Sequence, residues 1–214
     1  PETTELYEAI RDGQFSPVTS NFEAIQPLTC ADAPRSNLPR AISRFIGREQ
    51  EIAEVTALVG EHRLVTLTGP GGIGKTRLAL EVAHTWLAKR GEEVWRVDLA
   101  ALDEPSALPQ AIRKAFGIVI EGPGYDADML AATLSDRHAL LFLDNCERHI
   151  EDCAELAATL LRGTRHLRIL ATSRTALRLP GGQRWPVRGL ELPDANAELM
   201  ELTGSDAVAL FLDR

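Results

Sequence analysis

The sequence predicts an α/β fold, with a parallel sheet of about five strands, helices on both faces, and a short helix and a linker ahead of the sheet. Two observations predict this class. From about residue 42 onwards, short apolar runs alternate with longer amphipathic segments. Strands that alternate with helices are joined by crossover connections, which cover both faces of a parallel sheet. A glycine-rich turn over residues 69–76 also joins the first apolar run to the helix behind it.

Ahead of the sheet, the sequence predicts a tail helix and a linker. Residues 1–13 carry apolar side chains at helical spacing and end on a glycine, which is a typical helix stop. We interpret them as the end of an upstream helical domain. Residues 14–41 hold four prolines and no sustained hydrophobic period, as a linker does. Because the sequence starts at Pro1 and ends within a helical pattern, we expect it to be a piece of a longer chain.

The elements of the sheet domain follow from the hydrophobic period. Apolar residues at spacings of three and four indicate helices, and short apolar runs between turn residues indicate buried strands. The predicted strands are 63–68, 93–99, 138–143, 167–172 and a short 185–187, and the predicted helices are 49–59, 75–89, 106–116, 127–134 and 150–161.

The turn after the first predicted strand carries the pattern G-x-x-x-x-G-K-[ST], the P-loop or Walker A motif. Glycines let successive backbone N–H groups surround phosphate oxygens, and the helix behind the turn directs its positive end at the same anion. Lys75 would pair with the β- and γ-phosphates, and Thr76 would ligate Mg²⁺. The alternative is a glycine-rich turn that binds nothing, which the strand–turn–helix context disfavours. The predicted binding residues here are Gly69, Pro70, Gly71, Gly72, Ile73, Gly74, Lys75 and Thr76, with Arg77 directly behind them.

A carboxylate for the metal ends the third apolar run. Residues 140–144 read LLFLD and close on Asp144, as a Walker B strand does. Thr76 and Asp144 are therefore the predicted metal ligands, and the alternative for Asp144 is a cap on the next turn. Asn145 stands where many related ATPases have a second acid. Glu147 is then the candidate for orienting water, although a helix-start glutamate explains it equally well.

Two further segments complete the predicted site. Arg174 follows the fourth predicted strand and could contact the γ-phosphate, because a guanidinium is permanently charged and its fork matches phosphate oxygens. The alternative is a surface arginine. Apolar residues and a glycine ahead of the first helix could lie against an adenine, and a hydrophobic staple explains them equally well. These residues are Phe45, Ile46, Gly47 and Arg48; the predicted catalytic set is Lys75, Asp144, Glu147 and Arg174.

Composition and charge exclude several functions for this segment. Its formal charge of −8 argues against binding DNA or RNA with its own surface, because such surfaces are usually basic. No apolar run approaches the roughly 18 residues that span a bilayer, and no signal peptide is visible, so we expect no membrane partner. Three cysteines without metal spacing favour reduced thiols and a cytoplasmic location.

Taken together, these motifs resemble the nucleotide-binding domain of STAND ATPases (signal-transduction ATPases with numerous domains), also called NB-ARC-like domains. The likeness covers about residues 37–214. FIGRE at 45–49 is similar to a family motif that lies against the adenine, LDNCE at 143–147 to the Walker B form of bacterial regulators, and TSR at 172–174 to a sensor whose arginine reads the γ-phosphate. The residues in and around these motifs are most similar to those of SARP-type (Streptomyces antibiotic regulatory protein) and LuxR-type transcriptional regulators. Residues 1–15 are similar to the last helix of a bacterial transcriptional activator domain.

This resemblance implies a P-loop NTPase domain over 42–192 and the truncated start of a helical ARC subdomain over 193–214. It implies ATP or ADP with Mg²⁺, self-association in the ATP-bound form, and DNA contact only through domains outside this chain. The implied function is a regulatory switch with slow hydrolysis; the alternatives are a catalytic P-loop ATPase, a small-molecule kinase and a nucleotide-free scaffold. The family's GLPL motif and winged-helix histidine do not occur before Arg214, so we expect an incomplete pocket without its lid.

Overall fold

The computed structural model describes residues 35–40, 45–119, 126–190 and 206–212. The predicted tail helix, the first part of the predicted linker and most of the predicted ARC segment lie outside the described residues. The described residues form the sheet domain and one further helix, α8 (Asp206–Leu212), near the C-terminus.

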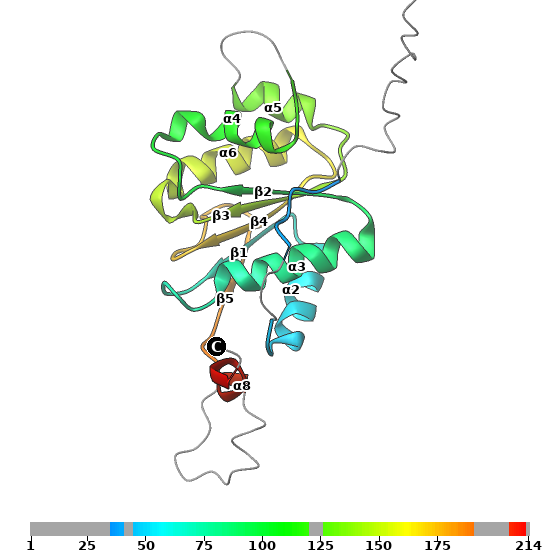
Figure 1. Cartoon of the computed structure of the whole chain (residues 1–214). Coiled ribbons are helices and arrows are strands. Elements are labelled where there is room, and N and C mark those ends of the chain that lie inside the picture. The colour runs from blue at the N-terminus through cyan, green and yellow to red at the C-terminus, as the bar shows by residue number, and fades with distance from the viewer. Residues whose placement is uncertain (1–34, 41–44, 120–125, 191–205, 213–214) are drawn as a thin grey trace, which may run out of the picture. The chain divides into compact units, whose positions relative to one another are not determined.

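Five strands form one parallel sheet. They are β1 (Leu64–Thr68), β2 (Glu93–Asp98), β3 (Ala139–Asp144), β4 (Arg168–Ser173) and β5 (Gln183–Pro186). Their order across the sheet is β2-β3-β4-β1-β5, and each neighbouring pair is parallel (Figure 1). The predicted parallel sheet of about five strands is confirmed.

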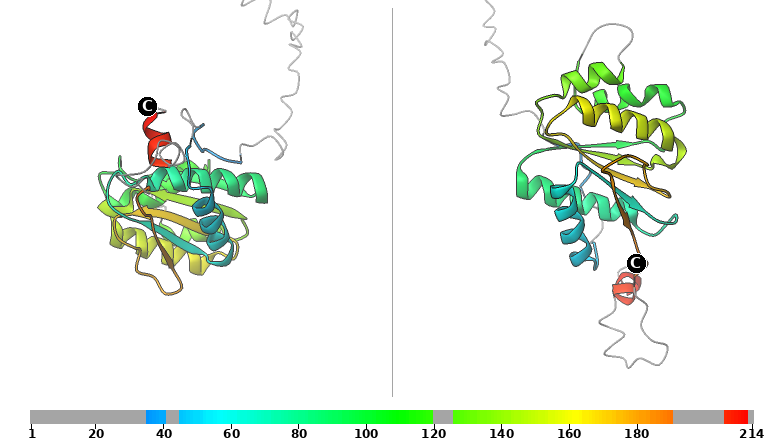
Figure 2. Two further views of the ribbon diagram at one scale, coloured as in Figure 1. Left: turned by 90° about the horizontal axis from the view of Figure 1, so that it is seen from below. Right: turned by 180° about the vertical axis from the view of Figure 1, so that it is seen from behind.

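Helices cover both faces of this sheet, as predicted. The helices are α2 (Glu49–Glu61), α3 (Lys75–Arg90), α4 (Leu108–Ala115), α5 (Ala127–Thr133) and α6 (Ile150–Gly163). α2 and α3 lie on one face, while α4, α5 and α6 lie on the other (Figures 1 and 2). The sheet is thus the middle layer of three, which is the architecture of a P-loop α/β domain.

The core consists of two apolar layers, one on each face. β1 and β3 are buried along their whole length, which explains why their sequences are apolar without alternation. Trp86 of α3 and Phe142 of β3 belong to one layer, and Leu141 of β3 and Leu160 of α6 belong to the other. Burying one such side chain stabilises the fold by about 1.5–3 kcal/mol, so β3 is held from both sides.

The observed elements differ from the predicted ones at their ends. The predicted helix over 106–116 starts as a 3₁₀ turn, Pro105–Ala107, before α4 begins. Prolines near the start of each piece lack the N–H that a continuous helix would need. β3 and β4 each extend one residue beyond the prediction. Asp144 and Ser173 are therefore the last strand residues and share the rigidity of the sheet.

The described end of the predicted linker lies along the free edge of β2. Ser36 forms a parallel bridge with Val94, and the Val94 N–H donates to the carbonyl of Arg35 at 2.9 Å. The Asn37 side chain completes this edge, because its amide donates to the Arg96 carbonyl at 2.8 Å and its oxygen accepts from the Arg96 N–H at 2.6 Å. These contacts satisfy backbone groups that an edge strand would otherwise expose.

Candidate functional site

Four parallel strands end at the same edge of the sheet, where the glycine-rich turn also lies. The turn follows β1, and the ends of β2, β3 and β4 bring Asp98, Asp144 and Ser173 to this edge. Ligands of open α/β sheets bind at the carboxyl ends of the strands. The predicted phosphate, metal and sensor residues therefore share one side of the domain.

The conformation of the turn requires glycine at two points. Gly74 directly precedes α3 and has a φ of 97°, a left-handed conformation that other residues rarely adopt. At Gly69, a Cβ atom would lie 3.2 Å from both the Val187 carbonyl oxygen and the Ile73 side chain. The motif glycines thus allow the turn to pack against the segment after β5 and lead directly into the helix.

Lys75 lies under the turn and not in solvent. Its side chain is only 8% exposed, and its Nζ donates to the carbonyls of Gly69 at 2.9 Å and Pro70 at 3.0 Å. A buried ammonium needs such partners because its transfer from water is costly. The charge is consequently held within the loop that the sequence identifies as the phosphate cradle.

A group of five side chains, which we call the metal-side cluster, surrounds the end of β3. Its centre is Asp144, which is fully buried. Oδ1 of Asp144 accepts hydrogen bonds from the Thr76 hydroxyl at 2.8 Å and the Thr172 hydroxyl at 2.5 Å. On the other side, Oδ2 accepts from Nη2 of Arg96 at 2.7 Å. The fifth member, Asp98, accepts from the same Nη2 at 2.9 Å.

The oxygen atoms of Thr76 and Asp144 suit a magnesium ion. A hydroxyl and a carboxylate are hard oxygen donors, and magnesium in nucleotide sites is held by one or two such side chains together with phosphate oxygens. Their separation of 2.8 Å brings both donors to one point at the start of α3. Among the described residues, no cluster of three His, Cys, Asp or Glu side chains could hold a metal by itself.

The contacts of Asn145 explain why an asparagine, and not a second acid, follows Asp144. Its φ is 62°, a left-handed conformation that asparagine tolerates better than most residues. Its backbone N–H donates to Oγ1 of Thr172 at 3.0 Å, and its side-chain amide donates to Oδ1 of Asp98 at 3.1 Å. A carboxylate at this position would face the carboxylate of Asp98. The asparagine is thus used as a donor that ties the end of β3 to the end of β2.

The charge of Asp98 is stabilised by its neighbours. Partial burial raises the pKa of this carboxyl, but hydrogen bonds from the Ala100 N–H and the Asn145 amide, together with the charge of Arg96, outweigh that effect. The pKa of Asp98 is lowered as a result. The metal-side cluster therefore contains two carboxylates and one guanidinium.

Arg174 and Glu147, which we call the tip pair, lie beside the turn but are loosely paired. The Nε of Arg174 is 3.8 Å from Oε1 of Glu147, and the Arg174 side chain is 69% exposed. A Cβ on Gly71 would lie 3.9 Å from Nη2 of Arg174, so the guanidinium is next to the crest of the turn. Oε2 of Glu147 is buried without a hydrogen-bond partner among the described residues. Both side chains thus adjoin the turn and retain capacity for further contacts.

The predicted adenine segment lies at the start of α2. Gly47 and Arg48 both have positive φ, 71° and 65°. The Arg48 guanidinium donates to the carbonyls of Ile73 at 3.2 Å and Arg188 at 2.9 Å, so it ties the turn to the segment after β5. Ile46 is half-buried beside it.

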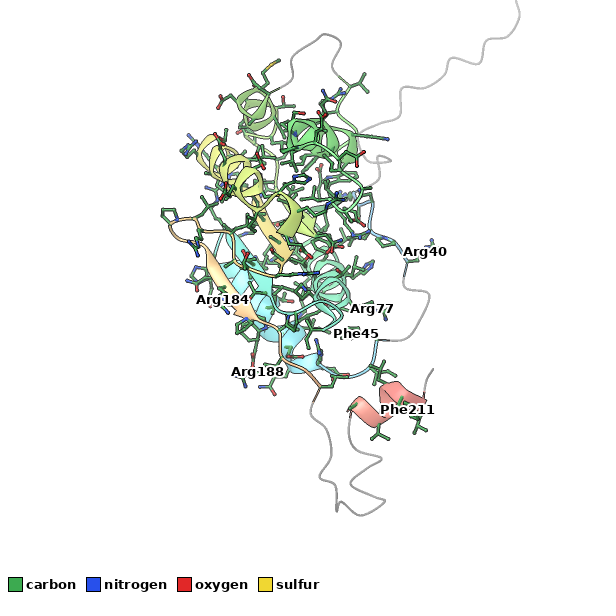
Figure 3. The ribbon with its side chains drawn as sticks, turned by 90° about the vertical axis from the view of Figure 1, so that its left-hand side faces the viewer. Arg40, Phe45, Arg77, Arg184, Arg188 and Phe211 are labelled. Atoms are coloured by element: carbon green, nitrogen blue, oxygen red, sulfur yellow. The ribbon has the colours of Figure 1, made fainter. Side chains whose placement is uncertain are left out.

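Phe45 and Arg77 come together on the same side of the turn. Phe45 is half-buried, and the guanidinium of Arg77 lies over its ring at 5.9 Å (Figure 3). The structure therefore brings the predicted segment to the P-loop. Arg48 of this segment is engaged with the carbonyls of Ile73 and Arg188, and the sequence did not indicate these contacts.

The two cysteines near β3 are buried thiols. Cys146 and Cys153 are both free and fully buried. A hydrogen bond with Cys153, burial, and the nearby charges of Asp144 and Glu147 raise the pKa of the Cys146 thiol well above its usual value. A thiol held in its neutral form is a poor nucleophile and a poor metal ligand. Both described cysteines are therefore part of the apolar core.

Sequence reasoning missed Arg96 and Asp98, and it missed the contact between Thr172 and Asp144. The sequence holds only part of the signal for the first two. Residues 96 and 98 are two apart in a strand, so their side chains share a face, and Asp98 ends its strand in register with Asp144. No pattern in a single sequence gives that register, because the order of strands in the sheet is a property of the whole fold.

Comparison with known proteins finds bacterial relatives of this domain. No family model matches the sequence. An uncharacterized protein of Mycobacterium tuberculosis is 37% identical over 180 residues, which are 82% of this chain and 42% of that protein. A putative HTH-type transcriptional regulator of the same organism is 35% identical over 158 residues, which are 74% of this chain and 16% of that protein. The regulatory protein AfsR of Streptomyces coelicolor is 27% identical over 99% of this chain and 21% of that protein.

The relatives include transcriptional and regulatory proteins of bacteria, as the resemblance predicts. The chain spans less than half of the length of the first two mycobacterial relatives and of AfsR. Among solved structures, a STAND protein with a tetratricopeptide repeat sensor from Pyrococcus horikoshii has a TM-score of 0.49 and 16% identity, over 72% of this chain and 24% of that one. No helix within the described residues is long and apolar enough to cross a membrane.

Proposed function

We propose that this chain is the nucleotide-binding switch module of a bacterial transcriptional regulator, and that it binds ATP or ADP with Mg²⁺. One observation carries the proposal: the Thr76 hydroxyl and the buried Asp144 carboxylate meet at 2.8 Å at the start of the helix that follows the glycine-rich turn. A hydroxyl from the end of a P-loop and a carboxylate from another strand form the usual protein half of a magnesium–nucleotide site.

The residues around this point have separate roles in the proposed site. The turn and the N-terminus of α3 would bind the β-phosphate, with Lys75 moving its ammonium from the loop carbonyls to phosphate oxygens. Arg174 would contact the γ-phosphate from the crest of the turn. Phe45, Ile46 and Gly47 would line the adenine. A bound magnesium ion would neutralise phosphate charge, and Thr76 and Asp144 would hold it.

The choice of residues after Asp144 favours slow hydrolysis of the nucleotide. Asn145 has no basic character, and its amide is used by Asp98. Glu147 has a buried oxygen without a partner among the described residues, so it is the group that could accept a hydrogen bond from an attacking water. Its ion pair with Arg174 at 3.8 Å would loosen if that arginine turned to the γ-phosphate. The contact between Arg174 and Glu147 would thereby link the identity of the bound nucleotide to the orientation of the attacking water.

The first test is nucleotide binding by calorimetry. We expect wild type to bind ADP and ATP, and Lys75→Ala to lose at least about tenfold in affinity, because a charge-assisted contact to phosphate is removed. Lys89→Ala is the matched control, since Lys89 is exposed at the far end of the same helix. Absence of binding in wild type, or equal affinities for all three proteins, would favour a scaffold whose P-loop is structural.

The second test separates a switch from simple binding. A ligand shifts a conformational equilibrium only through contacts that differ between the two states. Arg174→Ala is therefore expected to weaken ATP binding more than ADP binding, while Arg178→Ala, an exposed arginine on the same loop, leaves the ratio unchanged. Equal losses for both nucleotides would contradict γ-phosphate sensing by Arg174.

The unpartnered oxygen of Glu147 keeps a catalytic ATPase as a second candidate. Steady-state turnover above about 1 s⁻¹, within the usual enzyme range, would favour it.

We propose in addition that residues 42–192 are the nucleotide-binding domain, that 193–214 begin an ARC subdomain, and that the ATP-bound full-length protein self-associates. Size-exclusion chromatography of the full-length regulator with ADP and with a non-hydrolysable ATP analogue tests the last point.

A further inference from the structure

One guanidinium nitrogen is shared between two carboxylates at the carboxyl edge of the sheet. Nη2 of Arg96 is 2.7 Å from Oδ2 of Asp144 and 2.9 Å from Oδ2 of Asp98. The Asp144 side chain is completely buried, whereas that of Asp98 is 43% exposed. Arg96 therefore pairs with one carboxylate inside the domain and with a second one nearer to solvent.

The second carboxylate is fixed independently of Arg96. Asp98 accepts from the Ala100 N–H at 3.0 Å and from the Asn145 amide at 3.1 Å. The loop behind it is also tied to the β3 side, because the Leu99 N–H donates to the Asp144 carbonyl at 3.0 Å and Arg148 donates to the Ala100 carbonyl at 2.7 Å. Asp98 would thus remain in place if Arg96 changed its partner.

The contact of Arg96 with Asp144 concerns the same carboxylate that the proposed magnesium site uses. Oδ1 of Asp144 faces Thr76, and Oδ2 faces Arg96. A divalent cation at this carboxylate and a guanidinium at its other oxygen repel one another, and a nearby charge changes the ionic equilibrium of a carboxylate by tenfold or more. Moreover, Nε of Arg96 is buried without a partner among the described residues, so this guanidinium is incompletely bonded where it lies.

We propose that Arg96 is a built-in competitor for Asp144, which weakens magnesium binding at the nucleotide site and moves its ion pair to Asp98 when the metal binds. This inference rests on the proposed function, because it needs a magnesium–nucleotide site at Thr76 and Asp144. It makes Arg96 a positioning residue that sets how strongly nucleotide affinity depends on magnesium. Asp98 is its second partner, and Asn145 holds that partner in place.

The test measures ADP affinity by calorimetry in magnesium and in EDTA, and compares the ratio of the two dissociation constants between variants. Arg96→Met is expected to increase the magnesium-dependent gain by at least about tenfold, because the competing charge is gone. Arg96→Lys keeps a charge and is expected to stay near wild type. Asp98→Asn is expected to change the ratio in the opposite direction, by roughly twofold to fivefold, the range of a partly exposed ion pair.

The matched control is Arg137→Met. Arg137 pairs with Glu93 at 3.2 Å at the other end of β2, and the same change of side chain there is expected to leave the ratio unchanged. A second readout needs no nucleotide: magnesium alone should raise the melting temperature of Arg96→Met more than that of wild type, because the metal replaces the lost cation beside Asp144.

The outcomes distinguish a failure of the proposed competition from a failure of the proposed nucleotide site. If wild type binds ADP in a Lys75-dependent way and Arg96→Met has the wild-type magnesium ratio, the competition is wrong while the nucleotide site stands. If Arg96→Met does not fold, an Asp98→Asn ratio equal to or above wild type overturns the competition by itself. If wild type binds no ADP at all, the proposed function and this inference both fail.

Discussion

The metal-side cluster and the tip pair adjoin the same turn but are built differently. In the metal-side cluster, the buried carboxylate of Asp144 has three donors at 2.8 Å or less. In the tip pair, one contact of 3.8 Å joins a largely exposed arginine to a glutamate whose other oxygen has no partner among the described residues. The first group consists of residues in β2, β3, β4 and α3, whereas the second comes from a 3₁₀ turn after β3 and the loop after β4.

This difference indicates which part of the site can respond to a ligand. Side chains that are buried and fully bonded are costly to move, because each lost contact leaves a polar group unpaired. Side chains with weak contacts change partners at little cost. The metal-side cluster would therefore be preformed, and the tip pair would register which nucleotide is present. Arg96 is the exception in the metal-side cluster, because it has a second partner available.

The largest expected difference between the two regions is in the free energy of unfolding. Asp144→Ala would leave the hydroxyls of Thr76 and Thr172 without their acceptor and would leave Arg96 with Asp98 alone. Removing one partner of a buried ion pair costs about 3–5 kcal/mol. Glu147→Ala removes only a loose, partly exposed contact, so its expected cost is below about 1 kcal/mol. Urea unfolding of both variants measures the two values. Equal costs would mean that the metal-side cluster is no more rigid than the tip pair.

A smaller effect is expected at Thr172, which joins two segments of the metal-side cluster. Its hydroxyl donates to Asp144 and accepts from the Asn145 N–H, so Thr172→Val would leave a buried donor and a buried acceptor partly unsatisfied. The expected loss is about 1–3 kcal/mol. Thr172→Ser keeps the hydroxyl and should lose less. A valine variant as stable as the serine variant would show that this hydroxyl does not contribute.

The contrast also shows what a single sequence reveals about such a site. Residues 69–76 were predictable because glycine, lysine and threonine at fixed spacing have one common use, and the strand–turn–helix context agreed. Asp144 was predictable from the apolar run that it ends. The arrangement of strands was predictable in class, since alternation with helices implies a parallel sheet.

The contacts between strands were not predictable in the same way. Arg96 lies in the second strand of the chain and Asp144 in the third, and nothing in their spacing shows that Nη2 and Oδ2 meet. Asn145 was interpreted only as a missing acid, whereas its left-handed backbone and its bond to Asp98 explain the choice of residue. The bounds of helices shifted where prolines near residue 105 replaced a helical turn by a 3₁₀ turn.

A third expected effect separates the two roles of Asn145. Asn145→Ala loses the bond to Asp98 and leaves alanine, which lacks the polar side chain that eases this conformation for asparagine, in a left-handed conformation that costs about 1–2 kcal/mol. Asn145→Gly loses the same bond but adopts that conformation freely, so it should be more stable than the alanine variant. Thermal unfolding of both variants gives the difference. Identical stabilities would indicate that the backbone conformation at this position carries no strain.

The smallest expected effect is a pH dependence at the second partner of Arg96. The pKa of Asp98 is lowered in the folded state, whereas an unfolded aspartate titrates at about 3.9. A carboxyl with a lowered pKa stabilises the fold fully above the unfolded value, and that contribution is lost as the pH falls through the folded value. The stability gap between wild type and Asp98→Asn should therefore narrow below about pH 4, by a few tenths of a kcal/mol at most for a partly exposed group. Asp103→Asn, an exposed carboxylate on the same loop, is the control. A gap that stays constant between pH 6 and pH 3 would mean that the charge of Asp98 gains nothing from Arg96 and Asn145, and that Arg96 has only one effective partner, Asp144.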